Sequence, residues 1–397
     1  MKKDWIGIAI TSVLGLFLTA AERKIEAEGP DIRVSLFDLV KPRDVFVTAR
    51  LGTAALLLDD KERICRQLHI RLEKNGQLAV WVDGQDIGTC RNIHLSPSRE
   101  YGVSTIGVPG VRPRDYGGTF EISSGTDVLR IINILPLEPY LAGVIGPEIG
   151  SNPQALRAQA VVSRTFACAN RNRHDPAGYD FCDTTHCQLY QGLPDGTTGK
   201  EVMGAIADTQ GMVLTYQEHL CQVFYHSTCG GHTNSSEAVW PGLAAPYLVS
   251  VDDRPHCRNS PHFRWRYRIS QRKLSSVLAG LAAIGELLTL VPEKVGQGGW
   301  VQEVVLSDSA GRKKFLTGEE FRIGIDRVLG WNAIKSACFS VLREGNDWVF
   351  EGRGLGHGVG LCQWGAAALA EKGLNYTEIL AHYFPGTQVA SPILKEP

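Results

Sequence analysis

The stretch YLAGVIGPEIGSNPQALRAQAVVSRTFACA, residues 140–169, decides how this chain can fold. Its second half predicts a helix that begins at Pro153, because proline suits the first helical turn and Ser151 or Asn152 can cap the free amide groups. Small and apolar side chains cover most of this helix, which predicts burial against a sheet. The first half contains one acidic residue, Glu148, just ahead of the helix.

Glu148 allows two interpretations. A carboxylate near the start of a helix is stabilised by the macrodipole and by free backbone N–H groups. A carboxylate in apolar surroundings has a raised pKa, which suits a general acid near neutral pH. The helix that follows also contains Gln159 and Arg164, whose polar groups need partners if they are buried. Arg164 could face the same space as Glu148.

The rest of the chain divides into a strand-rich part and a mixed part. Short segments rich in β-branched and aromatic residues, separated by Gly, Asp and Asn turns, predict strands over residues 31–133. Further on we expect a short helix within residues 135–149, an apolar helix over residues 273–288, and a helix that starts near Cys362.

These elements predict an α+β fold. We expect mixed sheets and packed helices to form a substrate groove, beside an N-terminal β-rich lobe. The predicted divisions are residues 30–130 for the β-rich region and residues 131–390 for the catalytic domain. The composition is that of an ordinary globular protein, with 43% hydrophobic and 21% charged residues. A net charge of −1 gives no reason to expect a nucleic-acid partner or an electrostatically bound membrane surface.

Residues 1–29 resemble a targeting segment. Lys2 and Lys3 precede an apolar run from Trp5 to Ala21 that ends in small residues, which is typical of an export signal. Cleavage as a signal peptide and retention as a membrane anchor are both open, and a buried N-terminal helix is the alternative. We expect the bulk of the chain to be exported to the periplasm or cell surface, with membrane contact only through this segment. Ten cysteines agree with an exported protein.

The segment HDPAGYDFCDTTHC, residues 174–187, contains four potential metal ligands: His174, Cys182, His186 and Cys187. Thiolates and imidazoles are the ligands of structural zinc, so we predict a structural Zn²⁺ site. Adjacent His186 and Cys187 both turn inward only if the backbone bends sharply, so a site with three of these ligands plus an outside ligand or water is also possible. The same spacing would suit a Cys182–Cys187 disulfide, or four buried residues that hold no ion.

The segment FYHSTCGGHT, residues 224–233, reads as a strand end followed by a glycine pair. Its hydroxyl groups, including those of Ser227 and Thr228, are candidates for binding a substrate. A nucleophilic Ser or Cys would need a base beside it. Neighbours on a strand face opposite sides, so His226 is badly placed to activate Ser227 and covalent catalysis is disfavoured.

The segment GRGLGHGVGLCQWGA, residues 352–366, is rich in glycine but lacks the Lys-Ser/Thr end of a phosphate-binding loop. His357, Gln363 and Trp364 combine hydrogen-bonding groups with an aromatic face, which suits a sugar site. A tightly packed helix cap is the alternative interpretation.

Five motifs in this order resemble the stage II sporulation protein D (SpoIID/LytB) family, over roughly residues 131–389. They are NILPLEPYLAGVIGPEI followed by PQALRAQAVVSRTFA, then CDTTHCQLYQG, STCGGHT, APYLVSVDD with SPHFRW, and GRGLGHGVGLCQWGAAALAEKG. The resemblance implies action on cell-wall peptidoglycan: the sporulation members are lytic transglycosylases, and relatives modify amidase activity. It places the catalytic acid at Glu148 and an active-site arginine at Arg164. It also places a zinc ion at the Cys182–Cys187 loop, with His174 as the upstream ligand.

We therefore hypothesise an exported lytic transglycosylase that cleaves the MurNAc–GlcNAc bond of glycan strands to 1,6-anhydroMurNAc ends. Glu148 would act as general acid and base. The predicted substrate-binding residues are Arg164, Gln159, Ser227, Thr228, His357 and Gln363. Two rival hypotheses are a non-enzymatic glycan-binding protein or activator of a cell-wall amidase, and a metal-dependent hydrolase that uses the Cys/His loop.

Overall fold

The computed structural model describes residues 31–50, 52–59, 61–98, 102–145, 149–194 and 196–391. The predicted targeting segment, residues 1–29, and the predicted acid Glu148 lie outside the described residues. Within the described part, strands and helices are mixed in several sheets, which confirms the α+β class. No helix there is both long and apolar enough to cross a membrane.

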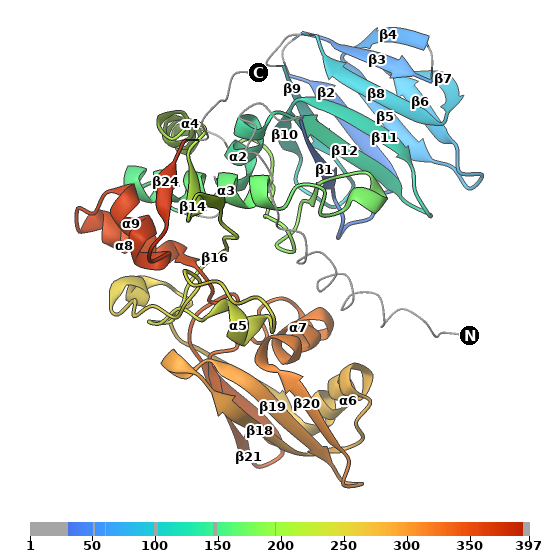
Figure 1. Cartoon of the computed structure of the whole chain (residues 1–397). Coiled ribbons are helices and arrows are strands. Elements are labelled where there is room, and N and C mark those ends of the chain that lie inside the picture. Colours follow the sequence, from blue (N-terminus) through green and yellow to red (C-terminus); the bar gives the residue numbers. More distant parts are fainter. Residues whose placement is uncertain are drawn as a thin grey trace.

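Two sheets dominate the first part of the chain (Figure 1, upper right). The first has the strand order β13-β1-β12-β11-β8-β3-β4, with bounds Phe181–Cys182, Ile32–Leu36, Leu129–Leu135, Thr119–Ser124, Asn92–Pro97, Ala54–Leu58 and Lys61–Cys65. The second has the order β10-β9-β2-β5-β6-β7, with bounds Arg114–Gly117, Val103–Gly107, Asp44–Ala49, Gln67–Leu72, Leu78–Val82 and Gln85–Cys90. Alternate side chains along most of these strands are buried, so the two sheets share one hydrophobic core.

The first sheet links the N-terminal region to the rest of the molecule. Strand β1 pairs antiparallel with β12 and parallel with the short β13, which places Ser35 opposite Cys182. The domain boundary predicted between residues 130 and 131 falls inside β12, and the division itself stays a prediction.

Helices pack against the inner end of these sheets and belong to the same core. They are α2 (Leu137–Ile145), α3 (Pro153–Ala169), α4 (Gly196–Asp208), α8 (Gln363–Glu371) and α9 (Tyr376–Tyr383), with the short helix α5 (Ser236–Val239). The turn η1 (Asp175–Ala177) has no buried residue and stays outside this core. Two small sheets lie among them: β15-β14-β24 (His219–Leu220, Val213–Tyr216, Gln388–Ala390) and β16-β23 (Tyr225–His226, Leu361–Cys362). The prediction for α3 is confirmed, since Pro153 opens it and the Asn152 side chain accepts a hydrogen bond from the Gln154 N–H.

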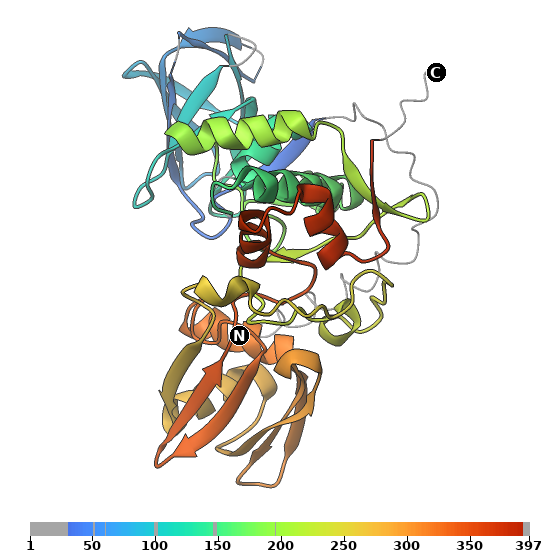
Figure 2. The ribbon, with the colours of Figure 1, turned by 90° about the vertical axis from the view of Figure 1, so that its left-hand side faces the viewer.

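Residues from about 265 to 350 form a separate lobe, at the bottom of Figures 1 and 2. It contains the sheets β17-β22-β21 (Trp265–Ser270, Asp347–Gly352, Phe339–Glu344) and β18-β19-β20 (Leu287–Val295, Val301–Asp308, Lys313–Thr317), the helices α6 (Gln271–Ala282) and α7 (Gly318–Leu329), and the turn η3 (Gln297–Gly299). These elements bury their own hydrophobic core. The helix predicted over residues 273–288 is shorter than expected, because Ala283 turns into the left-handed region and Leu287 already pairs in a strand.

Candidate functional site

The four predicted metal ligands come together at the edge of the first sheet. Cys182 ends β13, His174 directly precedes the turn η1, and His186 and Cys187 follow in one loop. One ligand atom from each residue can be chosen so that all lie within 4.8 Å of one another. The Cys182 and Cys187 sulfurs are 3.5 Å apart, and the His174 Nε2 atom is 3.3 Å from the Cys187 sulfur.

A tight turn lets His186 and Cys187 point the same way. The Cys187 N–H donates to the Thr184 carbonyl oxygen at 3.1 Å, and the His186 N–H donates to the Thr184 hydroxyl at 3.2 Å. The Asp183 carboxylate anchors the loop by accepting a 2.6 Å hydrogen bond from the Phe37 N–H at the end of β1. The His186 Nδ1 atom is consequently 3.5 Å from the Cys187 sulfur, so the sharp bend that the sequence required is present.

The chemistry of this donor set fits a four-coordinate zinc ion. The sulfur–sulfur separation of 3.5 Å far exceeds the roughly 2.05 Å of a disulfide bond but is close to that of two thiolates on one metal. The close contact between the two sulfurs, aided by His174 and His186, lowers the pKa of Cys182, and the same contact raises the pKa of Cys187. These contacts favour the thiolate form of Cys182, which is the form that binds zinc.

A second group of polar side chains is buried between α3, α8 and the segment after the Cys/His loop. The Gln363 side-chain amide donates to the side-chain amide oxygen of Gln159 at 3.5 Å, although the two residues are 204 positions apart. Gln159 in turn donates to the Ser163 hydroxyl at 3.0 Å. Gln188 donates to the Ser163 backbone carbonyl and accepts from the Tyr140 hydroxyl at 3.1 Å. The structure thus brings together two of the predicted substrate-binding residues, in a buried hydrogen-bonded chain.

Arg164 does not line an open surface. Its side chain is 1% exposed, and it donates two hydrogen bonds to the Glu138 carboxylate, at 2.8 and 2.7 Å. It also donates to the Met212 carbonyl oxygen at 3.1 Å. The sequence suggested that Arg164 binds the substrate, but in this conformation its guanidinium holds α2 against α3.

Ser227 and Thr228 lie beside the start of α8. Strand β16 pairs with β23, and the Trp364 N–H donates to the Ser227 carbonyl oxygen at 3.1 Å. Thr228 is fully buried and its hydroxyl is 2.7 Å from the Ser260 hydroxyl, whereas Ser227 is half-buried. The Ser227 hydroxyl lies 3.3 Å from that of Thr228, and of these two residues only Ser227 keeps part of its surface exposed.

His357 is a neutral, packed imidazole. Its Nδ1 atom accepts a hydrogen bond from the Val359 N–H at 3.0 Å, and its ring centre is 5.1 Å from that of Trp240. Burial lowers the pKa of His357 to about 3, so the ring is uncharged at neutral pH. Nearby Trp364 is 39% exposed and offers the aromatic face that a sugar ring would use.

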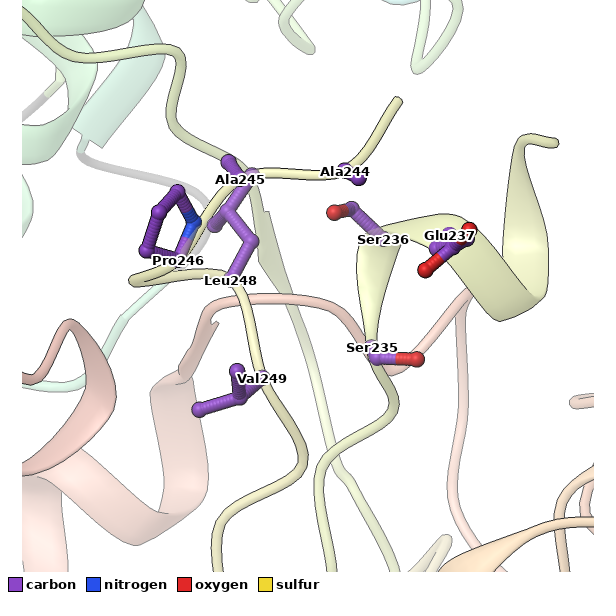
Figure 3. A pocket seen from close by; sticks show the side chains of 8 residues that line it. All are labelled: Ser235, Ser236, Glu237, Ala244, Ala245, Pro246, Leu248 and Val249. Atoms are coloured by element: carbon purple, nitrogen blue, oxygen red, sulfur yellow. The ribbon is translucent and has the colours of Figure 1, made fainter. Parts of the chain in front are cut away.

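An open pocket of about 290 Å³ lies elsewhere, between α5 and the following loop (Figure 3). Its lining is Ser235, Ser236, Glu237, Ala244, Ala245, Pro246, Leu248 and Val249. None of the predicted site residues lines this pocket, and its only charged group is the exposed Glu237 carboxylate.

Sequence reasoning missed two features of this region. Gln188 lies directly after the Cys/His loop, and its place in the motif CDTTHCQLYQG was the signal available for it. A second cluster, formed by Cys229, Asp253, Cys257 and Cys362, had no such signal because its members are widely spaced in the chain.

Two protein-family models match parts of this chain. The SpoIID family model, described as stage II sporulation protein, matches residues 126–216, and a domain of unknown function, DUF8618, matches residues 255–360. The chain is 33% identical to stage II sporulation protein D of Bacillus subtilis over 275 residues, covering 64% of this chain and 75% of that protein. The chain belongs to the SpoIID family.

Two more relatives widen this picture. Stage II sporulation protein D of Bacillus amyloliquefaciens is 33% identical over 64% of this chain and 74% of its own length. A protein named amidase enhancer, from Bacillus subtilis, is 28% identical over 63% of this chain but only 40% of its own length. The family model and these relatives place this SpoIID member among proteins linked to sporulation and the cell wall.

Proposed function

We propose that this SpoIID protein is an exported lytic transglycosylase that cleaves the MurNAc–GlcNAc bond of peptidoglycan, with Glu148 as general acid and base. The supporting observation is the convergence of distant motifs. The helix that follows Glu148 meets the start of α8 through the 3.5 Å contact between Gln363 and Gln159. The exposed Trp364 and the half-buried Ser227 lie at the same place.

A single carboxylate is enough for this reaction. Glycoside hydrolases use two carboxyl groups, one of which activates water or forms a covalent intermediate. In a lytic transglycosylase the C6 hydroxyl of the MurNAc residue is the nucleophile. Glu148 protonates the leaving GlcNAc oxygen, the bond to C1 breaks, the C6 oxygen bonds to C1, and Glu148 recovers its proton from that hydroxyl. Because the nucleophile belongs to the substrate, its proximity to C1 lowers the barrier.

The Cys/His loop would hold a structural zinc ion through His174, Cys182, His186 and Cys187. Four protein ligands complete a tetrahedral shell, whereas catalytic zinc sites keep one position open for water or substrate. The ion would supply a cross-link that fixes the loop to β1 and thereby orients Gln188. This argument favours a transglycosylase over a metal-dependent hydrolase.

Amidase activation is the second candidate, because one relative is named amidase enhancer. In that role the same surface would bind glycan strands without cleaving them, and the protein would act beside a cell-wall amidase. The match covers only 40% of that relative, so most of that protein's length lies outside the match.

Purified glycan strands separate the two functions. We expect the wild-type protein to release fragments with 1,6-anhydroMurNAc ends, identified by mass spectrometry. Replacing the acid in Glu148→Gln should reduce their formation at least about 100-fold. Glu371→Gln, which changes an exposed carboxylate on α8, is the matched control and should retain activity.

Three outcomes would contradict the proposal. Unchanged formation of anhydro products by Glu148→Gln would remove Glu148 from the reaction. Reducing-end products would indicate hydrolysis. Binding of strands with no new ends, together with faster release of peptides by an added amidase, would favour the activator.

A further inference from the structure

A second cluster of metal-binding groups lies in the interior, away from the Cys/His loop in sequence. The Sγ atoms of Cys229, Cys257 and Cys362 and a carboxylate oxygen of Asp253 all lie within 4.8 Å of one another. All four residues are at most 1% exposed. Cys229 lies in the loop after β16, and Asp253 lies just before the turn η2 (His256–Asn259). Cys257 belongs to that turn, and Cys362 caps α8.

The spacing is that of ligands which share one ion. The Cys229 and Cys257 sulfurs are 3.5 Å apart, and the Cys229 sulfur is 3.0 Å from Asp253 Oδ2. Tetrahedral Zn–S bonds of about 2.3 Å place neighbouring sulfurs about 3.8 Å apart, whereas a disulfide needs about 2.05 Å. Three thiols also cannot be satisfied by one disulfide, which would leave the third beside a buried carboxylate.

Backbone N–H groups point at the sulfurs. The Cys229 N–H donates to the Cys362 sulfur at 3.3 Å, and the Gly365 N–H donates to the same atom at 3.4 Å. The Gly231 N–H donates to the Cys229 sulfur at 3.3 Å. Donors in this arrangement stabilise thiolates over thiols, and outer hydrogen bonds of this kind orient the ligands of metal sites.

A hydrogen bond from outside the cluster also orients the Asp253 carboxylate, as is usual for carboxylate ligands of metal ions. Its Oδ1 atom accepts a 2.7 Å hydrogen bond from the Tyr383 hydroxyl, which leaves Oδ2 facing the sulfurs. Gly365 passes so close to both Asp253 and Tyr383 that an added Cβ atom would collide with them. The helix α8 therefore needs glycine at this position to admit the carboxylate.

The Asp253 carboxylate is buried in the interior. In the described part of the chain no lysine or arginine forms an ion pair with Asp253, and its nearest basic partner is the His382 ring, 3.5 Å away. Buried anions without a counter-charge are costly, so a cation at this place would stabilise the fold.

We propose that Cys229, Cys257, Cys362 and Asp253 form a second structural zinc site, distinct from the Cys/His loop. Cys257 lies where the chain enters the region 255–360, and Cys362 lies where it returns. The ion would therefore fasten both ends of the lower lobe to the main core. It would also fix the first turn of α8, which contains Gln363 and Trp364. The ion would have this structural role whether or not the protein cleaves glycans.

Metal analysis of the full chain tests the proposal. The protein is produced with zinc in the medium, desalted and analysed by inductively coupled plasma mass spectrometry. We expect Cys257→Ser to lose one equivalent of zinc relative to wild type. Cys221→Ser, which changes a buried cysteine outside both clusters, should lose none. A wild-type zinc content in Cys257→Ser would overturn the proposal.

A further variant separates the two sites. Cys187→Ser removes a ligand of the first loop, and adding Cys257→Ser to it should remove one more equivalent of zinc. This difference is expected even if the first loop binds no zinc, so failure of one assignment is distinguishable from failure of the other. Equal zinc in the single and double variants would contradict the second site.

Crystals of the wild-type protein give a test that does not depend on a variant folding. Anomalous scattering at the zinc edge should show a peak about 2.3 Å from the sulfurs of Cys229, Cys257 and Cys362. The proposal is wrong if that position has no anomalous peak, or if Cys229 and Cys257 form a disulfide bond.

Discussion

At the scale of single residues, Arg164 is a predicted substrate-binding residue that also has a structural partner. The resemblance to the SpoIID family implied an active-site role, and the helix pattern left its guanidinium in need of a partner. In the structure that partner is Glu138, whose side chain is 28% exposed and whose carboxylate accepts two hydrogen bonds from the Arg164 guanidinium. The ion pair joins α2, which precedes Glu148 in the chain, to α3, which follows it, so Arg164 fixes these two helices relative to each other.

Removing this arginine should destabilise the protein. Arg164→Ala leaves the Glu138 carboxylate partly buried and unpaired, which we expect to lower the free energy of unfolding by about 3 kcal/mol. Denaturant titration measures the loss. Arg254→Ala is the control, because it breaks an exposed pair with Asp252 and should leave the stability almost unchanged. Unchanged stability of Arg164→Ala with lost glycan binding would instead support direct contact with the substrate.

At the scale of secondary structure, the sequence of helix α2 fits its packing partners better than it fits helix propensity. Gly143 lies within it, where alanine would usually be better by roughly 1 kcal/mol. A Cβ atom at this position would collide with the Tyr190 ring and lie 3.1 Å from the Gly192 carbonyl oxygen. Tyr190 in turn donates a 2.7 Å hydrogen bond to Asn133 on β12. The glycine therefore allows α2 to lie close to the loop that continues from the Cys/His cluster.

Alanine substitution should have opposite signs in two helices. Gly143→Ala overpacks α2 against Tyr190, and we expect a loss of stability of about 1–3 kcal/mol. Gly204→Ala, in the exposed part of α4 where an added Cβ meets no atom within 4 Å, should raise stability by about 0.5–1 kcal/mol. Thermal unfolding of the two variants measures both effects. A stabilised Gly143→Ala protein would show that Tyr190 can move without cost.

At the scale of the whole molecule, the described residues form two main hydrophobic cores. One joins both N-terminal sheets to the helices around α3, and the other belongs to the lobe from about residue 265 to 350. Figures 1 and 2 show this lobe standing away from the rest of the molecule. The proposed second zinc site lies where the chain passes from one core to the other. The lobe lies outside residues 126–216, the segment that the SpoIID family model matches, and inside residues 255–360, the segment that DUF8618 matches.

Two separate cores predict two unfolding transitions. Phe350→Ala leaves a cavity in the core of the lobe. In calorimetry this variant should unfold its lobe at a lower temperature, with a loss of about 4 kcal/mol in the free energy of unfolding of the lobe, and should leave the other transition in place. Leu156→Ala, in the main core, should lower the other transition by about 3 kcal/mol. A single transition shifted equally by both variants would show that the two cores unfold together.

The sequence by itself determined the features that depend on neighbours in the chain. Asn152 and Pro153 specify the start of α3, and the residue spacing between His174 and Cys187 is short enough for one loop to bring four ligands together. The α+β class followed equally from local patterns of strands and helices. Periodicity and capping act over a few residues, so they can be recognised without knowledge of the fold.

The tertiary structure alone decided the partners of buried polar groups. Nothing near Arg164 in the sequence identifies Glu138 as its partner, and nothing near Gln159 identifies Gln363. The cluster of Cys229, Asp253, Cys257 and Cys362 has no compact spacing to indicate a metal site, because Cys362 joins the other three only after the chain has built the separate lobe and returned. Such contacts are set by how whole elements pack, and packing brings together residues whose separation in the chain is unrelated to their distance in space.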